Sequence, residues 1–155
     1  MRRVTAILSA AVVLTAAGLV AQAKPSFAGQ WKKVATNGQG EPGVDLIITQ
    51  GDAAMTVEDM RGGLAPAPVK LTYKLDGSVS RNMMAGRGGA PTEQVSKAMW
   101  DGNKIVVTTT TVAGAEKRTF SMDGGNLVVE TSAPNGGSSN VTRVTYKRYV
   151  RGYGG

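Results

Sequence analysis

The 155-residue chain contains no cysteine and no histidine. Without cysteine there is no disulfide framework, no lipobox-type acylation site and no thiol nucleophile. Without histidine the chain lacks the most common general base and the most common metal ligand. No Gly-x-Ser-x-Gly sequence is present to activate a serine, and the carboxylates are scattered along the chain. We therefore predict a protein that is not an enzyme, with no catalytic residues, no metal site and no cofactor.

Helical patterning is also missing, and aromatic residues make up only 5% of the chain. Instead, short runs of alternating apolar and polar residues recur, most clearly from Val69 to Leu75. This period of two is typical of β-strands with one buried face. Ten candidate strands lie near residues 28–36, 44–50, 53–58, 69–75, 78–82, 94–100, 104–112, 115–122, 126–132 and 140–149.

The links between these runs alternate in length. Several short links contain Asp-Gly, as at Asp76-Gly77 and Asp101-Gly102, and this dipeptide is a strong signal for a hairpin turn. In an up-and-down meander consecutive links fall at alternate ends, so the tight links that contain Asp-Gly or Gly-Asp fall at one end. The longer Gly- and Pro-rich breaks fall at the other end, together with the short Ala113-Gly114-Ala115 link. The longer breaks lie at 37–43, 59–68, 83–93 and 133–139. The pattern predicts an all-β fold, an antiparallel up-and-down β-barrel of about 8–10 strands with no substantial helix.

The first 23 residues have the features of an export signal. Arg2 and Arg3 precede an apolar stretch over 4–20, and Ala21-Gln22-Ala23 fits the small-x-small cleavage rule. We predict a signal peptide over 1–23, a single barrel domain over 24–150 and a tail over 151–155. Cleavage would leave no integral membrane span, whereas an uncleaved segment would act as an anchor. Loss of Arg2 and Arg3 would lower the formal net charge from +7 to +5.

The first strand begins with Gly29-Gln30-Trp31, which resembles the G-x-W signature of the calycins, the lipocalins and fatty-acid-binding proteins. The wider pattern, which includes Tyr73-Lys74-Leu75-Asp76-Gly77, resembles small exported bacterial lipocalin-like proteins of unassigned function. The resemblance implies a periplasmic or secreted bacterial protein. It also implies that the tryptophan packs across the closed barrel end under a basic side chain of the last strand. Strand counting separately brings the end of the last strand to this rim, with Arg148 or Lys147 near Trp31. We expect Gly29, Trp31 and Arg148 to form the barrel base.

The chain departs from the fatty-acid-binding proteins at two points. Residues 37–43 are short and Gly-rich where that family has a helical lid. The family's basic-x-Tyr carboxylate site is also not matched, because Arg143 and Tyr146 are three residues apart and would point to opposite faces of a strand. Tyr146 and Arg148 do share a face, but Arg148 is the residue expected over Trp31.

A candidate ligand site follows from the alternation of the strands. Arg118 shares a face with Phe120, so an inward Phe120 places a basic side chain inside the barrel, where burial without a partner is costly. The candidate ligand residues are therefore Tyr73, Arg118 and Phe120. Arg118 could bind an anionic headgroup there, with Tyr73 contributing a hydroxyl. Alternatively, Arg118 lies near the mouth and extends into water, or a bulge turns it outward.

Two functions remain open at this stage. The first is an exported, non-catalytic lipocalin-like barrel that binds a small apolar or amphipathic anionic molecule. The second is a structural module that contacts proteins or the envelope, with a solidly packed barrel, no ligand and weak attraction to anionic envelope surfaces. Nucleic acid is not an expected partner, because Arg61-Gly62-Gly63 and Arg87-Gly88-Gly89 are single copies on separate links and are interpreted as loops.

Overall fold

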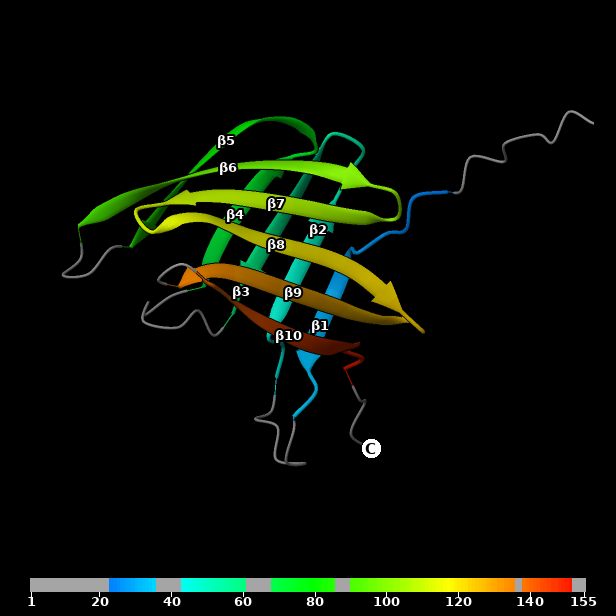
Figure 1. Ribbon diagram of the computed structural model, residues 1–155. Coiled ribbons are helices and arrows are strands. Elements are labelled where there is room, and N and C mark those ends of the chain that lie inside the picture. Colours follow the sequence, from blue (N-terminus) through cyan, green and yellow to red (C-terminus); the bar gives the residue numbers. More distant parts are fainter. Residues whose placement is uncertain (1–22, 36–42, 61–67, 86–89, 136–137, 152–155) are drawn as a thin grey trace, which may run out of the picture.

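The computed structural model describes residues 23–35, 43–60, 68–85, 90–135 and 138–151. These residues form ten strands and no helix, which confirms the predicted all-β fold class (Figure 1). The strands are β1 (Gly29–Lys33), β2 (Leu46–Gln50), β3 (Ala54–Asp59), β4 (Val69–Lys74), β5 (Asp76–Ala85), β6 (Pro91–Asp101), β7 (Lys104–Thr111), β8 (Gly114–Asp123), β9 (Asn126–Asn135) and β10 (Ser138–Arg148).

All ten strands belong to one antiparallel sheet with the order β4-β3-β2-β1-β10-β9-β8-β7-β6-β5. Pairing of β1 with β10 brings the first and last strands together, with Trp31 opposite Arg148. Figure 1 shows β6–β10 as a layer that crosses in front of β1–β4, and the interior between the two layers is called the lumen below. Within the described residues, no helix is long and apolar enough to cross a membrane.

The two ends of the barrel differ in the way predicted. The base is the end at which β2–β3, β4–β5, β6–β7 and β8–β9 connect through short turns. Gly77, Gly102 and Gly124 have positive φ in these turns, a conformation in which a side chain would be strained. The mouth is the opposite end, and most of its connections lie outside the described residues, including the two Arg-Gly-Gly segments.

Several strands extend further toward the mouth than the sequence pattern indicated. The break predicted over 83–93 is partly strand, because β5 continues to Ala85 and β6 begins at Pro91. An Arg81–Glu93 ion pair of 2.6 Å joins the outer faces of this extension. Pro91 is tolerated because it is the first residue of its strand, where the missing N–H costs little. The predicted break over 133–139 shortens in the same way, since β9 ends at Asn135 and β10 begins at Ser138.

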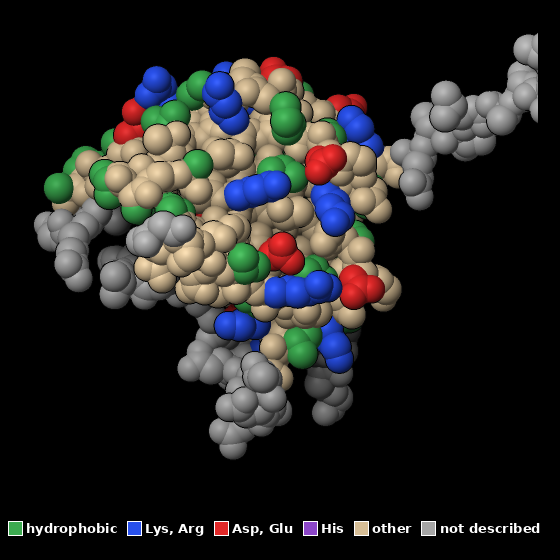
Figure 2. Space-filling view, viewed as in Figure 1, with side chains coloured by type: hydrophobic (Ala, Val, Ile, Leu, Met, Phe, Trp, Pro, Cys, Tyr) green, Lys and Arg blue, Asp and Glu red, His purple; other side chains and the backbone are tan. Residues whose placement is uncertain are grey.

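The outer face of β6–β10 carries charges of both signs (Figure 2). Lys97 and Lys117 lie on either side of Thr108 in the strand register, and all three side chains are exposed. Glu130 and Arg143 are paired across β9 and β10 on the same outer face. The net positive charge of the chain is therefore spread over a mixed surface, where salt in solution screens its long-range effect.

Candidate functional site

The base of the barrel is closed by the segment that precedes β1. Phe27 is fully buried and stacks on Trp100 of β6, with 5.9 Å between the ring centroids. The Trp31 indole Nε1 donates a 2.9 Å hydrogen bond to the Phe27 carbonyl oxygen, and the Phe27 N–H donates to the Gln50 side-chain oxygen at 2.8 Å. Burial of two aromatic rings with their polar atoms paired makes this end of the barrel a rigid, apolar floor.

Arg148 and Gly29 complete this floor. The Arg148 guanidinium lies 4.6 Å from the centroid of the Trp31 ring and donates a 3.2 Å hydrogen bond to the Ala28 carbonyl. Gly29 has a φ of 149°, and a Cβ atom there would lie 2.5 Å from the Arg148 guanidinium. Only glycine therefore allows the arginine to lie over the indole, an arrangement stabilised by a cation–π interaction. The structure brings together all three residues predicted for the base.

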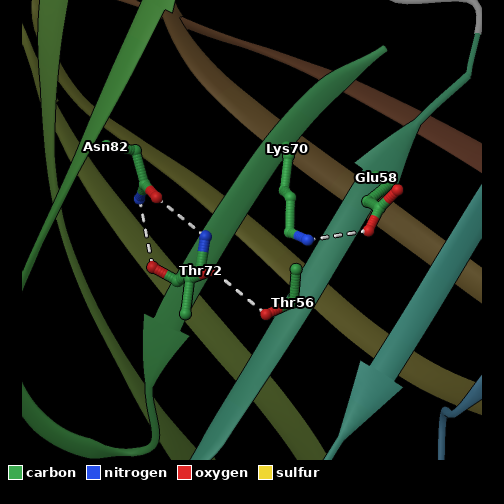
Figure 3. A network of polar contacts seen from close by, with 5 residues as sticks. All are labelled: Thr56, Glu58, Lys70, Thr72 and Asn82. Carbon is green, nitrogen blue, oxygen red and sulfur yellow. Dashed lines mark hydrogen bonds and ion pairs between the residues drawn. The ribbon is translucent and has the colours of Figure 1, made fainter.

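The barrel is not closed by a backbone ladder between β4 and β5. In the described part of the chain these two strands are the edges of the sheet, and side chains of β5 join them instead (Figure 3). Asn82 accepts a 2.8 Å hydrogen bond from the Thr72 N–H and donates a 3.1 Å bond to the Thr72 carbonyl. Ser80 accepts from the Lys74 N–H at 2.8 Å. The Asn82 amide thus replaces a peptide group of the missing ladder, and we call this join the seam.

The outer side of β4 is held to β3 by more than the backbone. Figure 3 shows a 3.0 Å hydroxyl contact between Thr56 and Thr72 and a 3.2 Å ion pair between Lys70 and Glu58. The strand β4 is therefore fixed to β3 along its length, while the seam to β5 depends on two side chains, those of Ser80 and Asn82.

Arg118 lies inside the barrel, as the alternation of β8 predicted. It is next to the buried Phe120 on the inner face and is paired with Val107 of β7 and Thr131 of β9. Its guanidinium forms a 3.4 Å ion pair with Glu116, two residues earlier on the same face. The side chains of Arg118 and Glu116 are 33% and 26% exposed, so both groups are reached by solvent. We call these two residues the lumen pair.

Two tyrosines from other strands lie within the electrostatic reach of the lumen pair. Burial raises the pKa of Tyr73 on β4, and the Arg118 charge opposes this rise while the Glu116 charge adds to it. Burial also raises the pKa of Tyr146 on β10 to about 12, with Asp59 adding to the rise and Arg118 opposing it. The Arg118 charge therefore lowers the pKa of phenols on β4 and β10, one in each layer of the barrel.

The two layers line the lumen with different chemistry. On the β2–β4 side the inner side chains are apolar and buried, including Leu46, Val57 and Leu71. On the β6–β8 side, Ser96 and Thr109 are buried and share a 2.8 Å hydroxyl hydrogen bond, and Thr109 is paired with Glu116. We call this side of the lumen the polar wall. Its inner side chains toward the mouth include Gln94, Ser96 and Thr109. Its row nearest the base is apolar and consists of Trp100, Ile105 and Phe120.

The predicted ligand residues are placed as follows. Tyr73 is buried in the core, and Phe120 belongs to the apolar row of the polar wall. Arg118 lies one inward position nearer the mouth than Phe120. The sequence prediction omitted Glu116, although its spacing of two residues from Arg118 was the signal that both share a face. The seam residues had no such signal, because no local pattern shows that a ladder between neighbouring strands is absent.

Comparison with known proteins supports the same fold. No protein-family model and no curated protein sequence matches the chain. Among solved structures, a point variant of the fluorescent protein UnaG is similar with a TM-score of 0.58 and 20% identity, over 81% of this chain and 97% of that chain. Zebrafish ileal bile acid-binding protein, in complex with cholic acid, is similar with a TM-score of 0.55 and 17% identity, over 79% and 98%. The chain has the calycin type of β-barrel fold.

Proposed function

We propose that this chain is an exported, non-catalytic barrel that binds a small amphipathic molecule in its lumen, with Arg118 holding the anionic group of that molecule. The observation that carries the proposal is the position of Arg118, a permanently charged side chain on the inner face of β8 that remains one-third exposed. A basic group in such a position is costly unless it has a function or full compensation, and its 3.4 Å ion pair with Glu116 is long.

The rest of the lumen supports an amphipathic ligand. The apolar side chains of β2–β4 would contact the hydrocarbon part of the ligand. The apolar floor with Phe27 and Trp31, together with Phe120, limits how deep that part reaches. The Tyr73 and Tyr146 phenols lie within the field of Arg118 and would donate hydrogen bonds at neutral pH, where a phenol with a pKa of about 10 or above is protonated. The similar structure of a bile acid-binding protein with cholic acid adds weight to this choice of ligand class.

The experiment is isothermal titration calorimetry with pentadecanoate and three proteins: the wild type, Arg118→Gln and the control Arg143→Gln. Arg143 lies on the outer face, where its 3.8 Å contact to Asp123 is exposed. We expect binding by the wild type, a loss of about tenfold in affinity for Arg118→Gln, and no change for Arg143→Gln. Equal affinities for all three proteins would refute the role of Arg118.

If no amphipathic probe binds at all, the alternative of a structural module that contacts proteins or the envelope takes its place. Export itself is tested by sequencing the N-terminus of the protein from its own host, which is expected to begin at Lys24. In the structure Lys24 lies 5.1 Å from the centroid of the Trp100 ring, so cleavage at this point would leave the floor of the barrel intact. An N-terminus at Met1 would contradict removal of the first 23 residues.

A further inference from the structure

The polar wall of the lumen contains acceptors as well as the Arg118 donor. The Glu116 carboxylate lies one inward position nearer the mouth than Arg118 on β8. Still nearer the mouth, on the inner face of β6, the Gln94 Oε1 atom is buried and accepts no hydrogen bond from any residue that the structure describes. A buried acceptor without a donor is unfavourable, and proteins retain few of them.

The lumen pair also disfavours a simple anion. Arg118 already has a carboxylate partner, so a ligand carboxylate would have to bind beside Glu116 or displace it. Two carboxylates around one guanidinium repel each other, and this repulsion is strong where solvent is partly excluded. A cationic or N–H-bearing group on the ligand, next to its anion, would remove that repulsion because it gives Glu116 a partner of its own.

We infer that the ligand carries a hydrogen-bond donor or positive charge directly beside its anionic group, as in an N-alkyl amino acid, and that Glu116 selects for it. The ligand's anion binds Arg118, and its donor group binds Glu116, which lies beside Arg118 on the same face. Gln94 Oε1 accepts a further hydrogen bond from the donor group. This inference rests on the proposed function, since it requires a ligand in the lumen, and it specifies the chemistry of the ligand's polar end.

The test uses two probes that differ at one position. N-dodecylglycine and pentadecanoate have the same chain length and the same terminal carboxylate, but a protonated amine in the first replaces a methylene in the second. Titration calorimetry at pH 7 gives both affinities for the same protein. We expect the wild type to bind N-dodecylglycine about tenfold more tightly than pentadecanoate, as the gain of one charged hydrogen bond predicts.

The variant Glu116→Gln is expected to move the two affinities in opposite directions. N-dodecylglycine loses its ionic partner and binds more weakly, while pentadecanoate binds more tightly because Arg118 is no longer neutralised. A general loss of structure would weaken both probes, so opposite signs identify a selective role. Glu130→Gln, on the outer face of β9, is the matched control and should leave both affinities unchanged.

Three results would overturn the inference. A wild type that prefers pentadecanoate, or binds the two probes equally, excludes a donor beside the anion without any variant being made. A preference that is the same in Glu116→Gln excludes selection by Glu116. If neither probe binds the wild type, the proposed function fails together with the inference, whereas binding of pentadecanoate alone refutes the inference and keeps the proposed function.

Discussion

The base of the barrel and its polar wall use opposite chemistry, although both belong to the interior of one sheet. At the base, Phe27 and Trp31 are fully buried, and the Trp31 Nε1 and the Phe27 N–H both have partners. On the polar wall, Arg118 and Glu116 are partly exposed and share one long contact, and the buried Gln94 side-chain oxygen has no hydrogen-bond partner among the described residues. One region has the features of a structural core, and the other has the features of a binding surface.

The difference shows where stability and function reside in this fold. A satisfied aromatic floor contributes burial energy and fixes the strand ends. A half-satisfied polar network contributes little to stability and is expected only where another molecule completes it. Substitutions at the base should therefore reduce the free energy of unfolding most, and substitutions on the polar wall should change binding more than folding.

The largest effect is expected from Trp31→Ala. Removal of a fully buried indole leaves a cavity and an unsupported Arg148, so the free energy of unfolding should fall by about 3–5 kcal/mol. Urea denaturation measures this loss, with Val141→Ala on an exposed position of β10 as the control. A loss below about 1 kcal/mol would show that the base is not the main structural core of the barrel.

A smaller effect is expected at the seam, where Asn82→Ala removes both hydrogen bonds to the Thr72 backbone. Two backbone groups then lose their partners, which should cost roughly 2–3 kcal/mol of unfolding free energy. Hydrogen exchange provides a local measurement, because the Thr72 amide should exchange faster while the β6–β8 amides change less. Asn140→Ala, exposed on β10, is the control, and an unchanged Thr72 amide would contradict a seam held by Asn82.

The smallest effect concerns Tyr146, whose pKa is raised to about 12 by burial and by Asp59, against the influence of Arg118. As the pH rises, the unfolded chain ionises first, near pH ~10, so stability is fully present below that pH and falls until about pH 12. Tyr146→Phe removes this contribution. Over that pH range its free energy of unfolding should therefore fall by roughly 1–2 kcal/mol less than that of the wild type. Urea denaturation at both pH values measures this difference, with Tyr149→Phe as the control. Equal losses of unfolding free energy in the wild type and Tyr146→Phe would contradict the prediction.

The fold was largely predictable from the sequence, because its signals are local. Alternation in each strand and Asp-Gly at the turns gave ten strands with short links at one end. The direction of the last strand predicted Arg148 or Lys147 near Trp31, and in the structure the Arg148 guanidinium lies over the Trp31 ring. Strand ends near the mouth were too short in the prediction, since Gly- and Pro-rich sequence was interpreted as loop although Pro91 begins a strand.

The candidate site was predictable only in part. The inward position of Arg118 followed from its spacing to Phe120, a property of one strand. Glu116 is also two residues from Arg118, but the formation of their ion pair depends on the side-chain conformations. The phenols of Tyr73 and Tyr146 come near Arg118 only because the barrel brings β4 and β10 around the same lumen as β8. Such long-range proximity leaves no trace in a local sequence pattern.

Nuclear magnetic resonance of the arginine side chains tests the central claim most directly. In ¹⁵N-labelled protein titrated with N-dodecylglycine, the Arg118 Nε resonance is expected to shift and its N–H to be protected from solvent, while the Arg143 resonance stays constant. A bound ligand that leaves Arg118 unchanged, or that shifts Arg143 instead, would contradict an anion site inside the barrel.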